Sequence, residues 1–258
     1  MATPTEGAAR PPWLVSFSVK LLCAAIAVLS IAWSLICLPI FANQTRLAGA
    51  RELILRNVPL SDADLDPLGA ALARAAAEGE CVPQLDRDAA IVRLRLAENA
   101  FVPERAGSID TRMEQLEAAV RKSLNCAPTD AYLWLVLFWV KNQRNGLSAA
   151  DFDLLRMSYR LGPNEGWVAR KRGHLALVMF DALPPDLADQ VVSEFARLVK
   201  TELYTEAIEL MAGPGWPHRD RLLAGLSAVP ERNKAIFLKA MADLGYDVDG
   251  SLRNRDHP

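Results

Sequence analysis

An uncharged apolar segment near the N-terminus places the strongest constraint on this chain. Residues 21–42, LLCAAIAVLSIAWSLICLPIFA, contain no charged side chain. A helix of this length, at 1.5 Å per residue, crosses the hydrocarbon core of a bilayer, which is about 30 Å thick. A cleavable signal peptide ending near Ile40–Ala42 and a buried core helix are the alternatives. Because signal peptides have shorter apolar regions and core helices rarely run this far without a charge, we predict an uncleaved transmembrane anchor at 21–42.

The charges beside this anchor leave its orientation nearly balanced. Arg10 and Lys20 precede it, within a short N-terminal flank at 1–20. Three arginines and one glutamate follow it: Arg46, Arg51, Glu52 and Arg56. The positive-inside rule alone is close to a tie, but the short flank and the absence of a second apolar span favour a cytoplasmic N-terminus. We therefore predict a single-pass protein of the inner (cytoplasmic) membrane whose C-terminal domain is periplasmic, if the source is a bacterium.

Charge and cysteine usage restrict the partners and the compartment. The formal net charge is −2, and the part beyond residue 42 is slightly more acidic than the whole. A nucleic-acid-binding domain usually has a strong basic excess, so no nucleic-acid partner is expected. Cys23 and Cys37 lie inside the anchor, whereas Cys81 and Cys126 lie outside it. The outer two could pair in an oxidising compartment, but the sequence leaves that pairing open.

Beyond the anchor, the apolar spacing predicts helices of about 11–18 residues joined by short turns, and no segment alternates as a strand would. Ser61 and Pro67 are helix-start signals, and Gly79 is a stop signal. The C-terminal part is interrupted by Pro184–Pro185, by Gly213-Pro214-Gly215 and by the single Pro230. The expected organisation has three parts: a linker and helical lead-in at 43–84, helical repeats at 85–182, and an irregular helical cap at 183–258.

Two stretches of the predicted repeats echo each other at an offset of 35 residues. RKSLNCAPTDAYLWLV begins at residue 121 and RMSYRLGPNEGWVARK at residue 156. The matched pairs are Arg121 and Arg156, Ser123 and Ser158, Pro128 and Pro163, Asp130 and Glu165, and Tyr132 and Trp167. A small serine lets two helices approach closely, and the proline sets the turn into the next helix pair. The acidic residue then favours the positive N-terminal end of the new helix.

This period and its helix–turn–helix content resemble the tetratricopeptide repeat (TPR) family over about residues 110–182. The resemblance implies an all-α, TPR-like solenoid of stacked antiparallel helix pairs, in which the first helix of each pair lines a concave groove. The sequence departs from the family pattern in three respects, and one of them is that the alanine positions of the second helix are only partly filled. Phe138 follows Trp134-x-x-Leu137 where the family has glycine, and no third proline follows Pro163 at the expected spacing.

Three segments hold the candidate partner-binding residues. The apolar run 131–140 offers Tyr132 and Trp139, although a helix that is apolar all round is usually buried. WVARKR at 167–172 offers Trp167, Arg170 and Arg172, which the resemblance places in the groove, facing an acidic ligand or a peptide carboxylate. A plain solvated face is the alternative there. The turn 213–220 offers Trp216, His218 and Arg219, or else a tryptophan that closes the end of the helical stack.

The motifs that the sequence lacks favour binding over catalysis. No pattern for zinc, for a nucleotide phosphate or for a serine nucleophile occurs, so we expect no catalytic residue, metal or cofactor. We predict a scaffold for a protein or peptide, such as an envelope subunit or part of a polysaccharide assembly or export system, more than for a small molecule. One alternative is an enzyme with a site between the repeats and residues 213–221. Another is a structural subunit of a membrane complex, packed through the small-residue side of 21–42.

Overall fold

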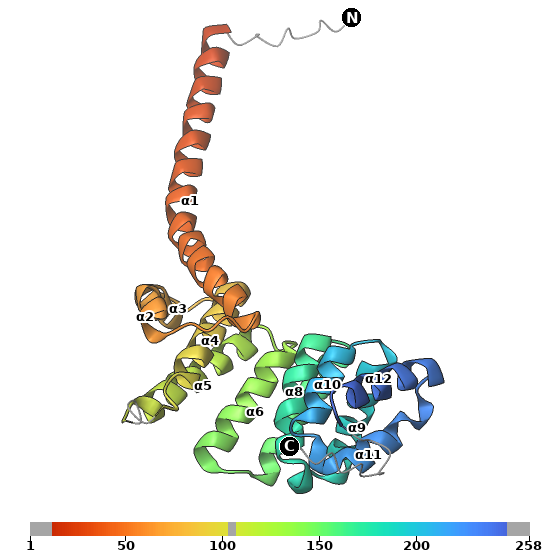
Figure 1. Ribbon diagram of the computed structural model, residues 1–258. Helices are drawn as coiled ribbons and strands as arrows, with labels where there is room; N and C mark the ends of the chain where they lie inside the picture. Colours follow the sequence, from red (N-terminus) through yellow and green to blue (C-terminus); the bar gives the residue numbers. More distant parts are fainter. Residues whose placement is uncertain (1–11, 103–106, 247–258) are drawn as a thin grey trace, which may run out of the picture. The chain divides into compact units, whose positions relative to one another are not determined.

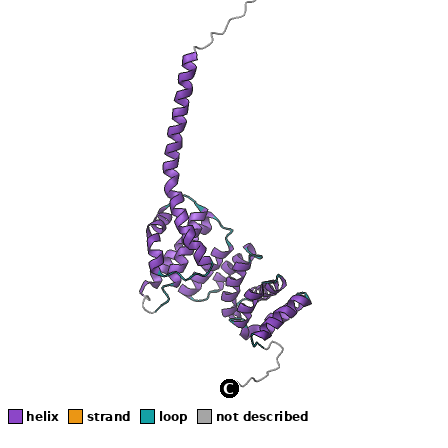
Figure 2. Ribbon diagram, turned by 45° about the horizontal axis from the view of Figure 1, so that its top comes forward, coloured by secondary structure: helices purple, strands orange, loops and turns teal. Residues whose placement is uncertain are grey.

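The computed structural model describes residues 12–102 and 107–246, and these residues form helices and connecting turns without a strand (Figures 1 and 2). The all-α prediction is therefore confirmed for this part of the chain. Most of the predicted flank and the last residues of the predicted cap lie outside the described residues. The chain divides into two compact units, Met1–Glu78 and Gly79–Pro258.

The first unit contains one long helix, α1 (Pro12–Leu55), of 44 residues (Figure 1). Its segment Val19–Leu38 has a mean hydropathy of 2.6 and is long and apolar enough to cross a membrane. The large apolar side chains of this segment are exposed, and Trp33 is 69% exposed. A bilayer would cover such a surface, whereas soluble monomers rarely expose apolar patches of this size. The helix continues past the apolar segment to Leu55.

Three short helices complete the first unit: α2 (Asp62–Leu65), the 3₁₀ turn η1 (Asp66–Leu68) and α3 (Gly69–Ala77). Ser61 caps α2, because its hydroxyl accepts from the N–H of Asp64 at 3.4 Å. The Asp64 carboxylate in turn accepts from the N–H of Ser61 at 2.8 Å, which completes a capping box. The predicted start at Ser61 is confirmed, and Pro67, the second predicted start signal, lies in the first turn of η1, just before α3.

The second unit consists of helices α4 to α12 with short 3₁₀ turns between some of them. Their bounds are α4 (Pro83–Glu98), α5 (Ile109–Cys126), α6 (Ala131–Asn145), α7 (Phe152–Leu161), α8 (Gly166–Val178), α9 (Pro185–Lys200), α10 (Tyr204–Ala212), α11 (Arg219–Gly225) and α12 (Glu231–Asp243). Consecutive helices α4 to α7 pack against one another, and α9 packs against α8 and α10. Helices α6, α8 and α10 also lie side by side (Figure 1).

The two echoing stretches form two matching turns between helices, 127–130 and 162–165, which we call the first and the second corner. Helices α5 and α7 end at Cys126 and Leu161, and α6 and α8 begin at Ala131 and Gly166, so both pairs of bounds differ by 35 residues. Ser123 and Ser158 are both buried, and their carbonyls accept N–H bonds of 2.8 and 3.1 Å from the residue after each helix. The 35-residue offset of the sequence is therefore also an offset of helix boundaries.

Close approaches join successive corners to each other. A Cβ atom added to Gly162 would lie 2.6 Å from the Cβ of Ala131, which begins α6. One added to Gly166, which begins α8, would lie 2.8 Å from Leu203, in the turn before α10. The rings of Tyr132 and Trp167, equivalent residues of the two corners, are 4.9 Å apart. Small residues at these positions let the corners pack directly on one another.

A disulfide joins Cys81 and Cys126, whose Cα atoms are 5.3 Å apart. It links the segment before α4 to the last residue of α5, at the first of the two corners. The sequence left this pairing open, because a separation of 45 residues says nothing about proximity in space. Cys23 and Cys37, both on α1, are free thiols.

Helices α5 and α6 are also joined by ion pairs around one carboxylate. Glu117 on α5, with only 10% of its side chain exposed, lies 2.8 Å from the Lys141 ammonium and 3.1 Å from the Arg121 guanidinium. Arg144 on α6 donates to its other oxygen. Although burial opposes ionisation, hydrogen bonds from these three cations lower the pKa of Glu117 to about 2.

We expect this carboxylate to make the fold acid-sensitive. A lowered pKa stabilises the fold fully above the unfolded-state pKa of about 4.5, and this contribution disappears as the pH falls through the folded-state value of about 2. Glu117→Gln should therefore lower the free energy of unfolding by about 3 kcal/mol at pH 7 and by almost nothing near pH 2. Urea unfolding followed by tryptophan fluorescence would measure this difference. A constant difference between pH 7 and pH 2 would contradict the assignment.

Candidate functional site

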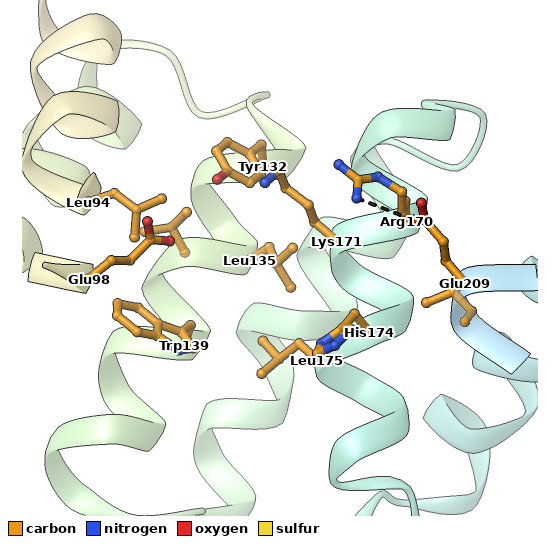
Figure 3. Close-up of a pocket in the computed structure, with 12 residues that line it drawn as sticks. Leu94, Glu98, Tyr132, Leu135, Trp139, Arg170, Lys171, His174, Leu175 and Glu209 are labelled. Carbon is orange, nitrogen blue, oxygen red and sulfur yellow. Dashed lines mark ion pairs between the residues drawn. The ribbon is translucent and has the colours of Figure 1, made fainter. Parts of the chain in front are cut away.

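A cavity of about 340 Å³ opens in the second unit between α4, α6, α8 and α10 (Figure 3). Its lining residues are Leu94 and Glu98 from α4; Tyr132, Leu135, Val136 and Trp139 from α6; Arg170, Lys171, His174 and Leu175 from α8; and Glu209 and Leu210 from α10. These four are alternate helices of the second unit. The volume lies near the lower end of the range typical of pockets for small molecules or single side chains.

The cavity has an apolar base and an aromatic side. Leucines from α4, α6 and α8 converge toward its centre (Figure 3). The rings of Tyr132 and Trp139 form one side, and Trp139 also contacts Phe101, with ring centroids 5.9 Å apart. Phe101 is 46% exposed and so continues the aromatic surface outward. Such a surface favours an apolar or aromatic side chain, whose burial would stabilise a complex by about 1.5–3 kcal/mol.

Charged groups from three helices surround this apolar base. Arg170 on α8 lies 3.5 Å from the carboxylate of Glu209 on α10 (Figure 3). Glu98 on α4 pairs with Arg95 at 3.4 Å and points between Leu94 and Leu135. Desolvation raises the pKa of Glu98, against the opposing effect of Arg95. Desolvation likewise lowers the pKa of Lys171, with Arg170 adding to the effect. Both groups would gain from a ligand charge of opposite sign.

Three of the eight sequence-predicted contact residues line this cavity, and a fourth lies beside it. Tyr132, Trp139 and Arg170 line it. Trp167 lies beside it through its contact with the Tyr132 ring, and it is 39% exposed. Tyr132 itself is buried, with 5% of its surface exposed, so it contributes a ring edge and not a free side chain.

Arg172 does not belong to this site, and its burial contradicts the predicted contact with a partner. The residue is fully buried. Its guanidinium pairs with Glu194 on α9 and donates to the carbonyls of Ser158 and Gly162 at 2.6 and 2.9 Å. The Ser158 carbonyl, in the last turn of α7, also accepts the N–H of Gly162 at 3.1 Å, and the Gly162 carbonyl lies just past the end of this helix. Arg172 therefore holds the second corner together from inside the fold.

The predicted residues of the 213–220 turn form a separate cluster. Trp216 packs against Tyr246 with ring centroids 4.9 Å apart, and the Arg219 guanidinium lies 5.2 Å from the Trp216 ring. His218 stacks on Phe180 at 4.6 Å. Residues 213–221 do not line the cavity. The tryptophan here makes internal contacts, which fits the alternative interpretation of a residue that closes helices against one another.

Several cavity residues were missed by sequence reasoning. On α8, Lys171 and His174 lie at helical spacing with the predicted Arg170 and so share one face with it, a signal that the sequence did contain. Glu98 and Glu209 gave no such signal, because each belongs to a different helix. Within residues 12–102 and 107–246, no three His, Cys, Asp or Glu side chains gather in a way that could hold a metal ion.

The chain matches no protein-family model, no curated protein and no solved structure. Its class is therefore defined by its fold alone. It is an all-helical protein with one helix apolar enough to cross a membrane and a cavity built from alternate helices of its second unit.

Proposed function

We propose that the protein is a membrane-anchored, TPR-like scaffold that binds a segment of a protein partner in the cavity of α4, α6, α8 and α10. The observation that carries this proposal is the origin of the lining residues, which come from alternate helices. In a stack of helix pairs, the first helices share one face, and that face forms a continuous groove.

The matching corners support the solenoid arrangement. Their helix boundaries differ by a constant 35 residues, and each corner packs on the next through glycine or alanine. A third approach of this kind occurs where Gly173 of α8 faces Leu210 of α10, since an added Cβ would lie 2.9 Å away. Repetition of one contact from pair to pair is the physical basis of a solenoid.

The disulfide and the apolar helix support the proposed location. Disulfides persist in oxidising compartments and are rare in the cytosol. A bond between Cys81 and Cys126 therefore favours a second unit on the periplasmic side of an inner membrane crossed by α1. This topology suits a partner that belongs to the cell envelope, including one in polysaccharide assembly or export.

The partner segment that best fits the cavity carries an apolar or aromatic side chain next to a charged group. Trp139 and the leucines would bury the apolar part, and Arg170 or Lys171 on α8 would pair with a carboxylate beside it. Interface energy usually concentrates in a few aromatic and arginine contacts. Trp139 and Arg170 are thus the residues expected to dominate binding.

Site-specific photocrosslinking in intact membranes tests this proposal. A photoreactive residue at His174, which lines the cavity, should crosslink to one discrete partner protein. Adding Trp139→Ala and Arg170→Ala should reduce this crosslink at least about tenfold, because two contacts of this kind contribute more than 1 kcal/mol each.

The matched control is a photoreactive residue at Ser193, an exposed position on α9 that does not line the cavity. It should give no such product. Circular dichroism must show that the double variant keeps its helix content. Equal crosslinking by the folded double variant, or the same product from position 193, would rule out the groove as the docking face.

One observation favours an enzyme as a second candidate. The shifted pKa values of Glu98 and Lys171 occur in the same cavity, and shifts of this kind are frequent at catalytic sites. The site predicted for an enzyme, between the repeats and residues 213–221, does not coincide with this cavity. No nucleophile or reaction class follows from these two groups, so we rank binding first.

A further inference from the structure

A second cavity, of about 670 Å³, lies along α7 and α9. Its lining residues are Asp153, Arg156, Met157, Tyr159, Arg160, Pro163, Gln190 and Arg197. It shares none of them with the proposed groove, and it uses the second helices of the pairs in place of the first ones. Three of the lining residues are arginines, so the question is whether their charges are already satisfied within the fold.

Arg156 is satisfied. Its guanidinium donates two bonds to Asp186, at 2.7 and 2.9 Å, and a third to Asp153 at 2.8 Å. Two carboxylates thus surround one cation, and Arg156 has little capacity left for a ligand. Its role is to hold the start of α9 against α7.

Arg160 and Arg197 have much weaker partners. Arg160 donates to the thioether sulfur of Met157, which is a poor acceptor. Arg197 lies 4.0 Å from Glu194, whose carboxylate is already engaged by the buried Arg172. Each guanidinium carries five N–H donors, so both retain donors for an oxyanion.

Two polar atoms of the same cavity wall also lack partners. The Tyr159 hydroxyl and the Gln190 side-chain oxygen are buried and make no hydrogen bond among the described residues. Tyr159 is only 5% exposed. Buried polar groups almost always have a partner, so such exceptions indicate an absent water or ligand. Both atoms are closed to solvent, and the long arginine side chains of the wall must move for a ligand to reach them.

We propose that this cavity binds an acidic saccharide, meaning a sugar that carries a carboxylate or a phosphate. Arg160 and Arg197 would hold the acidic group through charge-assisted hydrogen bonds. A sugar hydroxyl can accept from the Tyr159 hydroxyl, and another can donate to the Gln190 oxygen. The volume is far larger than the ~30 Å³ of one water molecule, so a small inorganic ion would not fill it. The proposal is independent of the partner groove.

Calorimetric titration of the full chain in detergent micelles tests it, with four probes: glucuronate, glucose 6-phosphate, glucose and inorganic phosphate. We expect at least one acidic sugar to bind, with an affinity that falls as salt rises. Glucose and inorganic phosphate should each bind at least about tenfold more weakly, because each lacks one half of the contacts. Equal affinity for inorganic phosphate would mean an adventitious ion only. That result, or no binding of either acidic sugar, would overturn the proposal.

Variants locate the site. Arg160→Gln with Arg197→Gln should weaken the acidic sugar at least about tenfold, whereas Lys200→Gln, an exposed change on α9 outside the cavity, should not. Tyr159→Phe should weaken it about threefold to tenfold, because the change removes one hydroxyl from the cavity wall. Unchanged affinity in the folded double variant would place the binding elsewhere and contradict the assignment.

Discussion

Replacing Arg172 with methionine will lower the free energy of unfolding by about 3–5 kcal/mol, the largest effect we expect from a single substitution in this chain. The change leaves the Glu194 carboxylate, 3% exposed, without its buried counter-charge. It also removes the donors to the Ser158 and Gly162 carbonyls that end α7. Urea unfolding at pH 7, followed by tryptophan fluorescence, would measure the loss as a shift of the midpoint.

Arg170→Met is the matched control, because it lies two residues earlier on the same helix. Its pair with Glu209 is partly exposed, with side chains 31% and 56% accessible, so it should change stability by less than about 1 kcal/mol. The double variant Arg172→Met, Glu194→Leu should recover much of the stability lost by Arg172→Met, since no unpaired charge then remains buried. A loss below about 1 kcal/mol for Arg172→Met would show that the network does not hold the corner.

Arg172 also shows where sequence reasoning fails in this chain. A run of cations in WVARKR suggests a solvated or ligand-binding face, because buried arginines are rare. The residue that reverses this interpretation is Glu194, 22 residues further along and on another helix. Nothing in the local pattern indicates that pair. Charge partners across a helical stack depend on which faces meet, and a single sequence does not contain that information.

Boundary signals were more reliable, because they act within a few residues. Asp130 was expected to favour the start of a helix, and its carboxylate accepts from the N–H groups of Tyr132 and Leu133 at 3.0 Å. Pro128 and Pro163 mark the two corners because a proline stops the preceding helix at both places. The apolar block at 21–42 was equally clear, since its length and composition alone indicate a helix that is able to cross a membrane.

Only some residues of the candidate cavity could be predicted, because its lining comes from four separate helices. Residues of α6 and α8 stood out because aromatic and basic side chains are concentrated in two short stretches. Glu98 and Glu209 contribute one charge each from α4 and α10, and neither helix has an unusual composition near them. A site assembled from four helices can be inferred from sequence only where a single helix supplies several of its residues.

Reduction of the Cys81–Cys126 disulfide should cost about 4 kcal/mol of stability, the second large effect that we expect. The bond closes a loop of more than 40 residues, and a cross-link of that length removes much of the conformational entropy of the unfolded chain. Urea unfolding with and without dithiothreitol would give the difference. The double variant Cys81→Ala, Cys126→Ala should show the reduced stability in both conditions.

The free cysteines of α1 provide the control for this experiment. Cys23→Ser with Cys37→Ser leaves the disulfide intact, so its response to dithiothreitol should equal that of the unaltered chain.

The redox state of Cys81 and Cys126 in cells tests the proposed compartment, because a cytosolic second unit would be kept reduced and would have to fold without the stability that the disulfide provides. Thiol labelling immediately after cell lysis should therefore modify Cys81 and Cys126 only after a reductant is added. Full labelling without reductant would contradict the proposed periplasmic location while leaving the helical fold intact.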